Sequence, residues 1–255
     1  MRTPLPHLAL LGALALGGAL SIAGSDAAEA QTASVTPTPA TADLDLTAAR
    51  VRHLADLGLL VFEQDVAGTA GATAPAAKGA VDGAPVLGYV FPTTLSPADV
   101  GFTAAGGIVA LAATSHPDFD DTPLWDENGD RDYANDGVVF HSHWVLLGPD
   151  DRVPGGLAVV ETQRIEQDLP PTAPGMPMYL DSPGFSVVLR GHTLRLLVPL
   201  DRVGGRTDFR FDAVAAYMEV NQSDPGRPLL GVYEVYEVYD VLSGDLSLPF
   251  SVTEE

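Results

Sequence analysis

The sequence predicts an all-β protein, an antiparallel β-sandwich of the jelly-roll or immunoglobulin-like type, with about nine strands and one short N-terminal helix. Apolar runs rich in Val, Leu, Tyr and Phe recur along most of the chain, with Gly, Pro, Asp and Asn between them. Short runs separated by turn residues are typical of antiparallel sandwiches and barrels. The nine runs cover residues 59–68, 86–91, 106–114, 137–147, 156–162, 184–190, 192–200, 209–220 and 229–242.

Residues 1–30 have the features of a secretory signal peptide. Arg2 is the only cation ahead of an apolar run, and Ala28-Glu29-Ala30 gives a small-x-small cleavage pattern after it. The run is shorter than the roughly 20 apolar residues that a membrane span needs. The chain contains no cysteine. Export without disulfides indicates a bacterial secreted or periplasmic protein, with no membrane span after signal cleavage.

Residues 31–45 predict a flexible tether, and residues 46–253 predict a single domain. The tether is rich in Thr, Ala and Pro. Such a composition buries too little apolar surface to offset the entropy of the chain. The domain begins with residues 46–58, where Leu and Val recur at helical spacing and Gly58 provides a stop signal. This segment predicts the N-terminal helix.

Turn and loop residues mark the boundaries between the predicted strands. Residues 69–85 are small and apolar without a period, and residues 169–184 contain five prolines. Both segments predict irregular loops, since proline resists strand pairing. Arg190-Gly191-His192 predicts a tight hairpin turn in which Gly191 takes a positive φ.

The charge of the chain excludes some classes of partner. The formal net charge is −21 at pH 7, and Lys78 is the only lysine. A surface this anionic repels phosphate backbones and anionic lipids, so we expect neither nucleic acid nor a membrane surface as a partner. The same charge attracts divalent cations.

An acidic loop precedes the fourth predicted strand and predicts a calcium site. Oxygen donors recur there at every second position, as Asp126, Asn128, Asp130 and Asp132. Such donors suit Ca²⁺, which takes six to eight oxygens. The spacing resembles the start of an EF-hand loop, D-x-N-x-D. Arg131 replaces the turn glycine of that loop, however, and Gly137 replaces its bidentate glutamate. A solvated acidic turn is the alternative.

A histidine pair in the string FHSHW follows the acidic loop. His141 and His143 alternate along a predicted strand, so both imidazoles project from the same face of the sheet. Such a pair shares a transition metal when a third ligand comes from elsewhere, and His116 is the natural candidate. The predicted ion is zinc or copper. Semi-buried histidines that hydrogen-bond to the acidic loop are the alternative.

The FHSHW string is similar to short motifs in two families of metalloenzymes. It resembles the F-H-x-H-W strand of the alpha carbonic anhydrases, in which both histidines bind zinc. It also resembles the F-H-x-H strand of the copper–zinc superoxide dismutases. Neither likeness extends beyond four or five residues, and the third histidine of the anhydrases is missing. The resemblance implies only that His141 and His143 are paired ligands.

The sequence pattern of the later predicted strands resembles that of another group of proteins. GFSVVLRGHTLRLLVPLDRVGG and then TDFRFDAVAAYM are similar to the later strands of DOMON-type and related carbohydrate-binding sandwiches. The likeness covers about fifty residues. It implies an extracytoplasmic module that binds carbohydrate or another small ligand.

Two functions follow from these patterns. The first is a secreted or periplasmic binding or structural module, with a divalent cation, calcium, in the acidic loop. The second is a transition-metal-dependent enzyme that uses zinc or copper held by His116, His141 and His143. The sequence does not decide whether the protein is an enzyme, and it identifies no catalytic residue and no organic cofactor.

Overall fold

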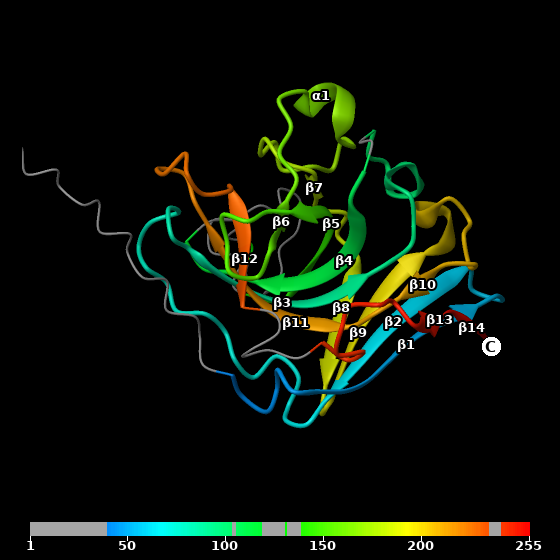
Figure 1. Cartoon of the computed structure of the whole chain (residues 1–255). Coiled ribbons are helices and arrows are strands. Elements are labelled where there is room, and N and C mark those ends of the chain that lie inside the picture. Colours follow the sequence, from blue (N-terminus) through cyan, green and yellow to red (C-terminus); the bar gives the residue numbers. More distant parts are fainter. Residues whose placement is uncertain (1–39, 104–105, 119–130, 132–138, 235–240) are drawn as a thin grey trace, which may run out of the picture. The chain divides into compact units, whose positions relative to one another are not determined.

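The computed structural model describes residues 40–103, 106–118, 131, 139–234 and 241–255, all within one unit, Val35–Glu255. The predicted signal peptide lies outside them. The described residues form fourteen strands in three sheets (Figure 1). They contain little helix: α1 covers Ile165–Asp168, and two 3₁₀ helices cover Pro97–Val100 and Leu200–Val203.

Six strands close into an antiparallel barrel. Its members are β3 (Pro85–Pro92), β4 (Ile108–Ser115), β5 (His141–Pro149), β6 (Leu157–Val159), β11 (Val214–Val220) and β12 (Leu230–Glu234). They follow one another in the order β3, β4, β5, β6, β12 and β11, and β11 pairs with β3 to complete the ring. A further short strand, β7 (Leu180–Asp181), pairs with β5 beside β6.

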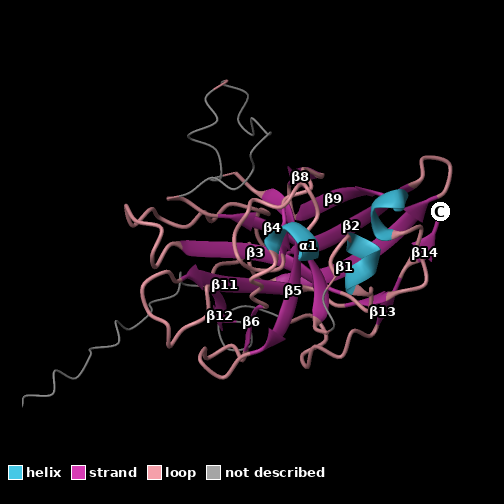
Figure 2. Ribbon diagram, turned by 90° about the horizontal axis from the view of Figure 1, so that it is seen from above, coloured by secondary structure: helices cyan, strands magenta, loops and turns pink. Residues whose placement is uncertain are grey.

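A five-stranded sheet forms the second part of the fold. Its order is β14 (Thr253–Glu254), β1 (Leu46–Leu54), β2 (Leu59–Val66), β9 (Thr193–Pro199) and β8 (Ser186–Arg190), and Figure 2 shows these strands side by side. All neighbours are antiparallel except β1 and β14. A small ribbon of β10 (Arg210–Phe211) and β13 (Phe250–Ser251) completes the structure.

The main core lies between the outer wall of the barrel and the five-stranded sheet. Phe62 of β2 is fully buried there, with its ring centroid 5.3 Å from that of Phe91 of β3 and 6.4 Å from that of Trp144 of β5. Leu194 and Leu196 of β9 belong to the same cluster. Because residues alternate along a strand, each barrel strand presents one set of side chains to this core and the other set to the lumen.

The predicted β-sandwich is wrong, since β4 pairs with β3 along one edge and with β5 along the other, and the ring has no free edge. The two sheets of a sandwich keep their edges, whereas closure into a barrel removes them. The apolar alternation correctly indicates strands. It contains no information on which strand pairs complete a ring.

The predicted helix over residues 46–58 is also wrong. Leu46–Leu54 form β1, which pairs with β2 along its length, and the turn that follows ends at Gly58. Arg50 and Arg52 of β1 both form ion pairs with Glu63 of β2. Cross-strand pairing of this kind outweighs the local helical spacing of the apolar residues.

Several loop predictions are confirmed. Residues 69–84 contain no strand, and Gly191 turns between β8 and β9 with φ of +62°. The Pro-rich segment 169–184 is irregular apart from β7.

Asp43 and Leu44, at the end of the predicted tether, are buried. None of the described helices is long and apolar enough to cross a membrane.

Candidate metal centre

Three histidines lie close together at one end of two paired strands of the barrel. β4 ends at Ser115, so His116 comes directly after it, and β5 begins with His141. The antiparallel register places His141 opposite Thr114, and His143 opposite Ala112. Because β4 ends and β5 begins at the same end of this antiparallel pair, the pairing brings the three histidines together.

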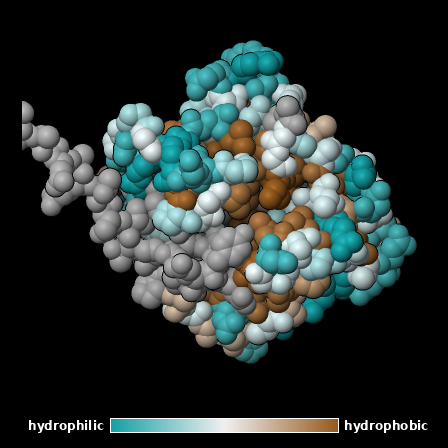
Figure 3. Space-filling model, viewed as in Figure 1, coloured by the Kyte–Doolittle hydropathy of each residue, from teal (hydrophilic) through white to brown (hydrophobic). Residues whose placement is uncertain are grey.

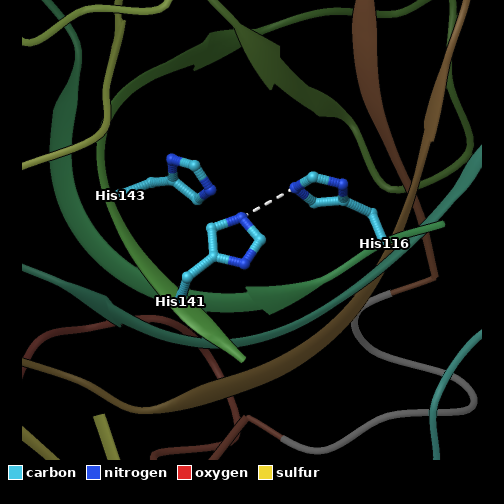
Figure 4. Close-up of side chains that lie close together, drawn as sticks. All are labelled: His116, His141 and His143. Atoms are coloured by element: carbon cyan, nitrogen blue, oxygen red, sulfur yellow. Dashed lines mark hydrogen bonds between the residues drawn. The ribbon is translucent and has the colours of Figure 1, made fainter. Parts of the chain in front are cut away.

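Strand alternation points the imidazoles into the barrel. Val145, which shares their face of β5, packs in the lumen, whereas Trp144 and Leu146 belong to the core outside it. The prediction that His141 and His143 share one face is therefore confirmed. His116, His141 and His143 are only 2%, 4% and 3% exposed. Figure 4 shows the three rings inside the circle of strands, pointing toward one another.

The three side chains are close enough to share one ion. One candidate ligand atom from each residue can be chosen so that all three lie within 4.8 Å of one another. The ring centroid of His141 lies 4.6 Å from that of His116 and 4.7 Å from that of His143, and the remaining pair is 6.1 Å apart. Imidazole nitrogens on one tetrahedral ion are about 3.3 Å apart, given metal–nitrogen bonds of roughly 2 Å. Small side-chain rotations therefore suffice to place an ion between them.

Hydrogen bonds determine which nitrogen of His141 carries the proton. Its Nδ1 lies 2.7 Å from the carbonyl oxygen of Val139. A carbonyl only accepts, so Nδ1–H donates, and Nε2 of the neutral ring carries a lone pair. That Nε2 lies 2.8 Å from Nε2 of His116 (Figure 4). A backbone carbonyl at the far nitrogen is a common support for a metal-binding histidine.

His143 has a buried hydrogen-bond partner that the sequence did not indicate. The hydroxyl of Ser182, directly after β7, lies 3.1 Å from Nδ1 of His143. Nε2 is therefore the candidate ligand atom of His143. Ser182 lies in the Pro-rich segment, far along the chain, and no motif or spacing connects it to FHSHW. Only the pairing of β7 with β5 brings it there.

The neighbouring carboxylate of Asp181 is buried but points away from the histidines. Leu180 of the same short strand packs in the lumen, so Asp181 projects to the opposite face. Burial raises the pKa of Asp181, although the hydroxyl of Thr172, the charge of Arg202 and the amide of Ser182 act in the opposite direction. Asp181 is therefore not a ligand of the three-histidine site.

The predicted calcium ligands lie outside the described residues. These are Asp126, Asn128, Asp130 and Asp132. Asp118, at the start of the acidic loop, is described, and its carboxylate accepts hydrogen bonds from the amides of Lys78 and Gly79 at 2.9 and 2.7 Å. Of the seven predicted metal ligands, the structure describes the three histidines and brings them together.

Comparisons with known proteins identify no relative: no family model, no curated protein and no solved structure matches the chain.

Proposed function

We propose that the protein is a transition-metal-dependent enzyme in which His116, His141 and His143 bind one zinc or copper ion. One observation supports this above all others. Three buried imidazoles from two paired strands converge inside the barrel, with ligand atoms of all three within 4.8 Å. Imidazole is a good ligand for zinc and for copper, and copper has the higher affinity among divalent ions.

Three histidine ligands suit a catalytic metal site. Structural zinc sites are closed by four protein ligands, whereas catalytic sites use three and keep a position for water or substrate. Among the described residues, the candidate cluster contains three ligands. The metal would supply Lewis acidity or a redox centre there. The chain holds the rings in place through the Val139 carbonyl and the Ser182 hydroxyl.

The other sequence-based expectations stay predictions. They are the calcium site in the acidic loop, export to the periplasm or the medium, and a carbohydrate ligand. No described residue adds support to any of them.

Metal content tests the proposal directly. The full chain is stripped with a chelator, dialysed against zinc, copper and calcium in separate samples, and analysed by mass spectrometry of the elements. We expect one equivalent of zinc or copper, and at least a hundredfold weaker binding after His116→Ala, His141→Ala or His143→Ala. His192→Ala is the matched control, because His192 lies in the exposed turn before β9. Calcium alone, or zinc retained by the triad variants, would contradict the proposal.

A second test asks whether the hydroxyl of Ser182 orients the imidazole ring of His143. We expect Ser182→Ala to weaken metal binding about 10- to 100-fold, because partners of this kind orient the ligand. Ser182→Thr keeps the hydroxyl and should restore most of the affinity. Circular dichroism checks that both variants fold. Equal affinity in Ser182→Ala and the natural chain would show that the hydroxyl does not orient His143.

A further inference from the structure

The barrel lumen is an apolar cavity that shares its wall with the histidine site. The space between its walls, open solvent included, is about 790 Å³. Both His116 and His143 line it. Apart from them and Thr114, the described lining is apolar, with Val90, Val145 and Met218 among its members. In the view of Figure 3, apolar side chains gather over the region of β4 and β5.

Small residues explain why the lumen is not filled. The interior of a small barrel is normally packed with side chains, and eight strands are typical of barrels that hold a small ligand. Here three neighbouring strands contribute Gly88, Ala112 and Ala216 to the inner face. A Cβ atom added at Gly88 would lie 3.0 Å from the Cε of Met218 and 3.5 Å from the Cγ2 of Thr114. Met218 therefore occupies the space beside Gly88, and the open space of the lumen lies beside Ala112 and Ala216, which line it.

The chemistry of the lining indicates what fits. A sugar would leave most of its hydroxyl groups without partners on this wall, and an unsatisfied buried polar group costs free energy. An apolar body, in contrast, gains free energy from burial. Carboxylate oxygen is itself a ligand of zinc. A carboxylate-like group at one end of the ligand would therefore bind an ion held by the three imidazoles.

We propose that the lumen binds a small, mainly apolar molecule with a carboxylate-like end, and that this end reaches the metal while the apolar body lies along the barrel. The inference rests on the proposed metal site and adds the class of substrate. The position of His143 supports it, because His143 and Val145 are consecutive lumen-facing residues of β5. A molecule seated between them touches the metal ligands and the apolar wall together.

A series of straight-chain carboxylates tests the proposal. The full chain is loaded with Co²⁺, whose absorption spectrum reports coordination, and titrated with butanoate, hexanoate and octanoate. We expect a spectral change with each, and an affinity that rises about fourfold per methylene. Alkanols of the same lengths should bind more weakly, because they bring no charge. In metal-free protein, carboxylates should lose their advantage over alkanols.

A variant separates the lumen from the metal. Ala216→Leu fills space in the lumen without replacing a metal ligand, and we expect it to bind Co²⁺ normally while octanoate binds at least tenfold more weakly. Val188→Leu on the exposed face of β8 is the control and should bind octanoate unchanged. If Co²⁺ binds but affinity is independent of chain length, the inference is overturned while the metal site stands. If no metal binds, the proposed function fails, and the inference fails with it.

Discussion

The outer and inner faces of the barrel strands differ in the size of their side chains. On the outer face, Tyr89, Phe91, Trp144 and Tyr217 are almost completely buried against the rest of the core. On the inner face, the described lining of the lumen contains no phenylalanine, tyrosine or tryptophan. The same strands supply both faces, so the difference arises from alternate residues of one stretch of sequence.

The two faces of the barrel strands contribute differently to the stability of the fold. Large aromatic residues bury much apolar surface and provide most of the packing energy of a core. Small residues on the other face give up packing energy and leave a cavity. A cavity lined by apolar groups is costly to stability. Its presence beside three converging histidines is understandable if the space is used by a ligand.

Neighbouring alanines on β11 test the contrast most strongly. Ala215 faces the outer core and Ala216 faces the lumen, and both are buried. We expect Ala215→Leu to lower the free energy of unfolding by about 1–3 kcal/mol, because extra methylenes do not fit a packed core. Ala216→Leu should cause no loss, because its added atoms enter open space and bury apolar surface. Urea unfolding of the metal-free chain measures both.

The two substitutions are matched, because they make the same change on adjacent residues of one strand. Any effect of strand propensity is therefore shared, and only the face differs. Equal destabilisation by both would mean that the lumen is as tightly packed as the outer core. The proposed ligand site would then lose its physical basis.

Much of the fold could be predicted from the sequence, but its closure could not. The alternation in FHSHWVLL correctly places His141, His143 and Val145 on one face, because this property belongs to a single strand. The pairing of β4 with both β3 and β5 depends on contacts between segments, which alternation does not encode. The same limit explains the error at β1, where ion pairs to Glu63 on the neighbouring strand accompany the strand conformation.

The residues of the candidate site were also predictable only in part. His116 could be proposed as a third ligand because metal chemistry requires one and few histidines are available. Ser182 could not, because nothing in the Pro-rich segment indicates that β7 pairs beside His143. The side chains with distinctive chemistry were therefore predictable from the sequence. An ordinary hydroxyl whose role depends on a long-range strand pairing was not.

Two buried aspartates near β7 allow a second comparison, with a smaller expected effect on stability. One carboxylate has hydrogen-bond donors and the other has an oxygen without a partner among the described residues. The carboxylate of Asp168 accepts hydrogen bonds from the hydroxyls of Thr162, Thr103 and Tyr179 at 2.7, 2.8 and 2.9 Å. Those bonds, from Thr162 first, lower its pKa. Asp181 differs, because its Oδ1 has no hydrogen-bond partner among the described residues and burial raises its pKa.

The opposite shifts predict opposite dependences of stability on pH. For Asp168, the stabilisation is complete above the unfolded pKa of about 3.9 and is lost as the pH falls through the lower folded pKa. Asp168→Asn should therefore lower Tm at pH 7, with a smaller difference below about pH 4. For Asp181, the penalty is absent below the unfolded pKa and becomes complete as the pH rises through the higher folded pKa.

Asp181→Asn should consequently raise Tm at pH 7, and the gain should disappear below about pH 4, where the natural carboxyl is protonated in both states. Thermal unfolding of the metal-free chain between pH 3 and 8, followed by circular dichroism, measures both variants. A lower Tm for Asp181→Asn across the whole range would indicate that the charged carboxylate is satisfied in the fold. In that case the two aspartates would not differ in whether their carboxylates are stabilised by hydrogen bonds. The comparison of the two barrel faces would be unaffected.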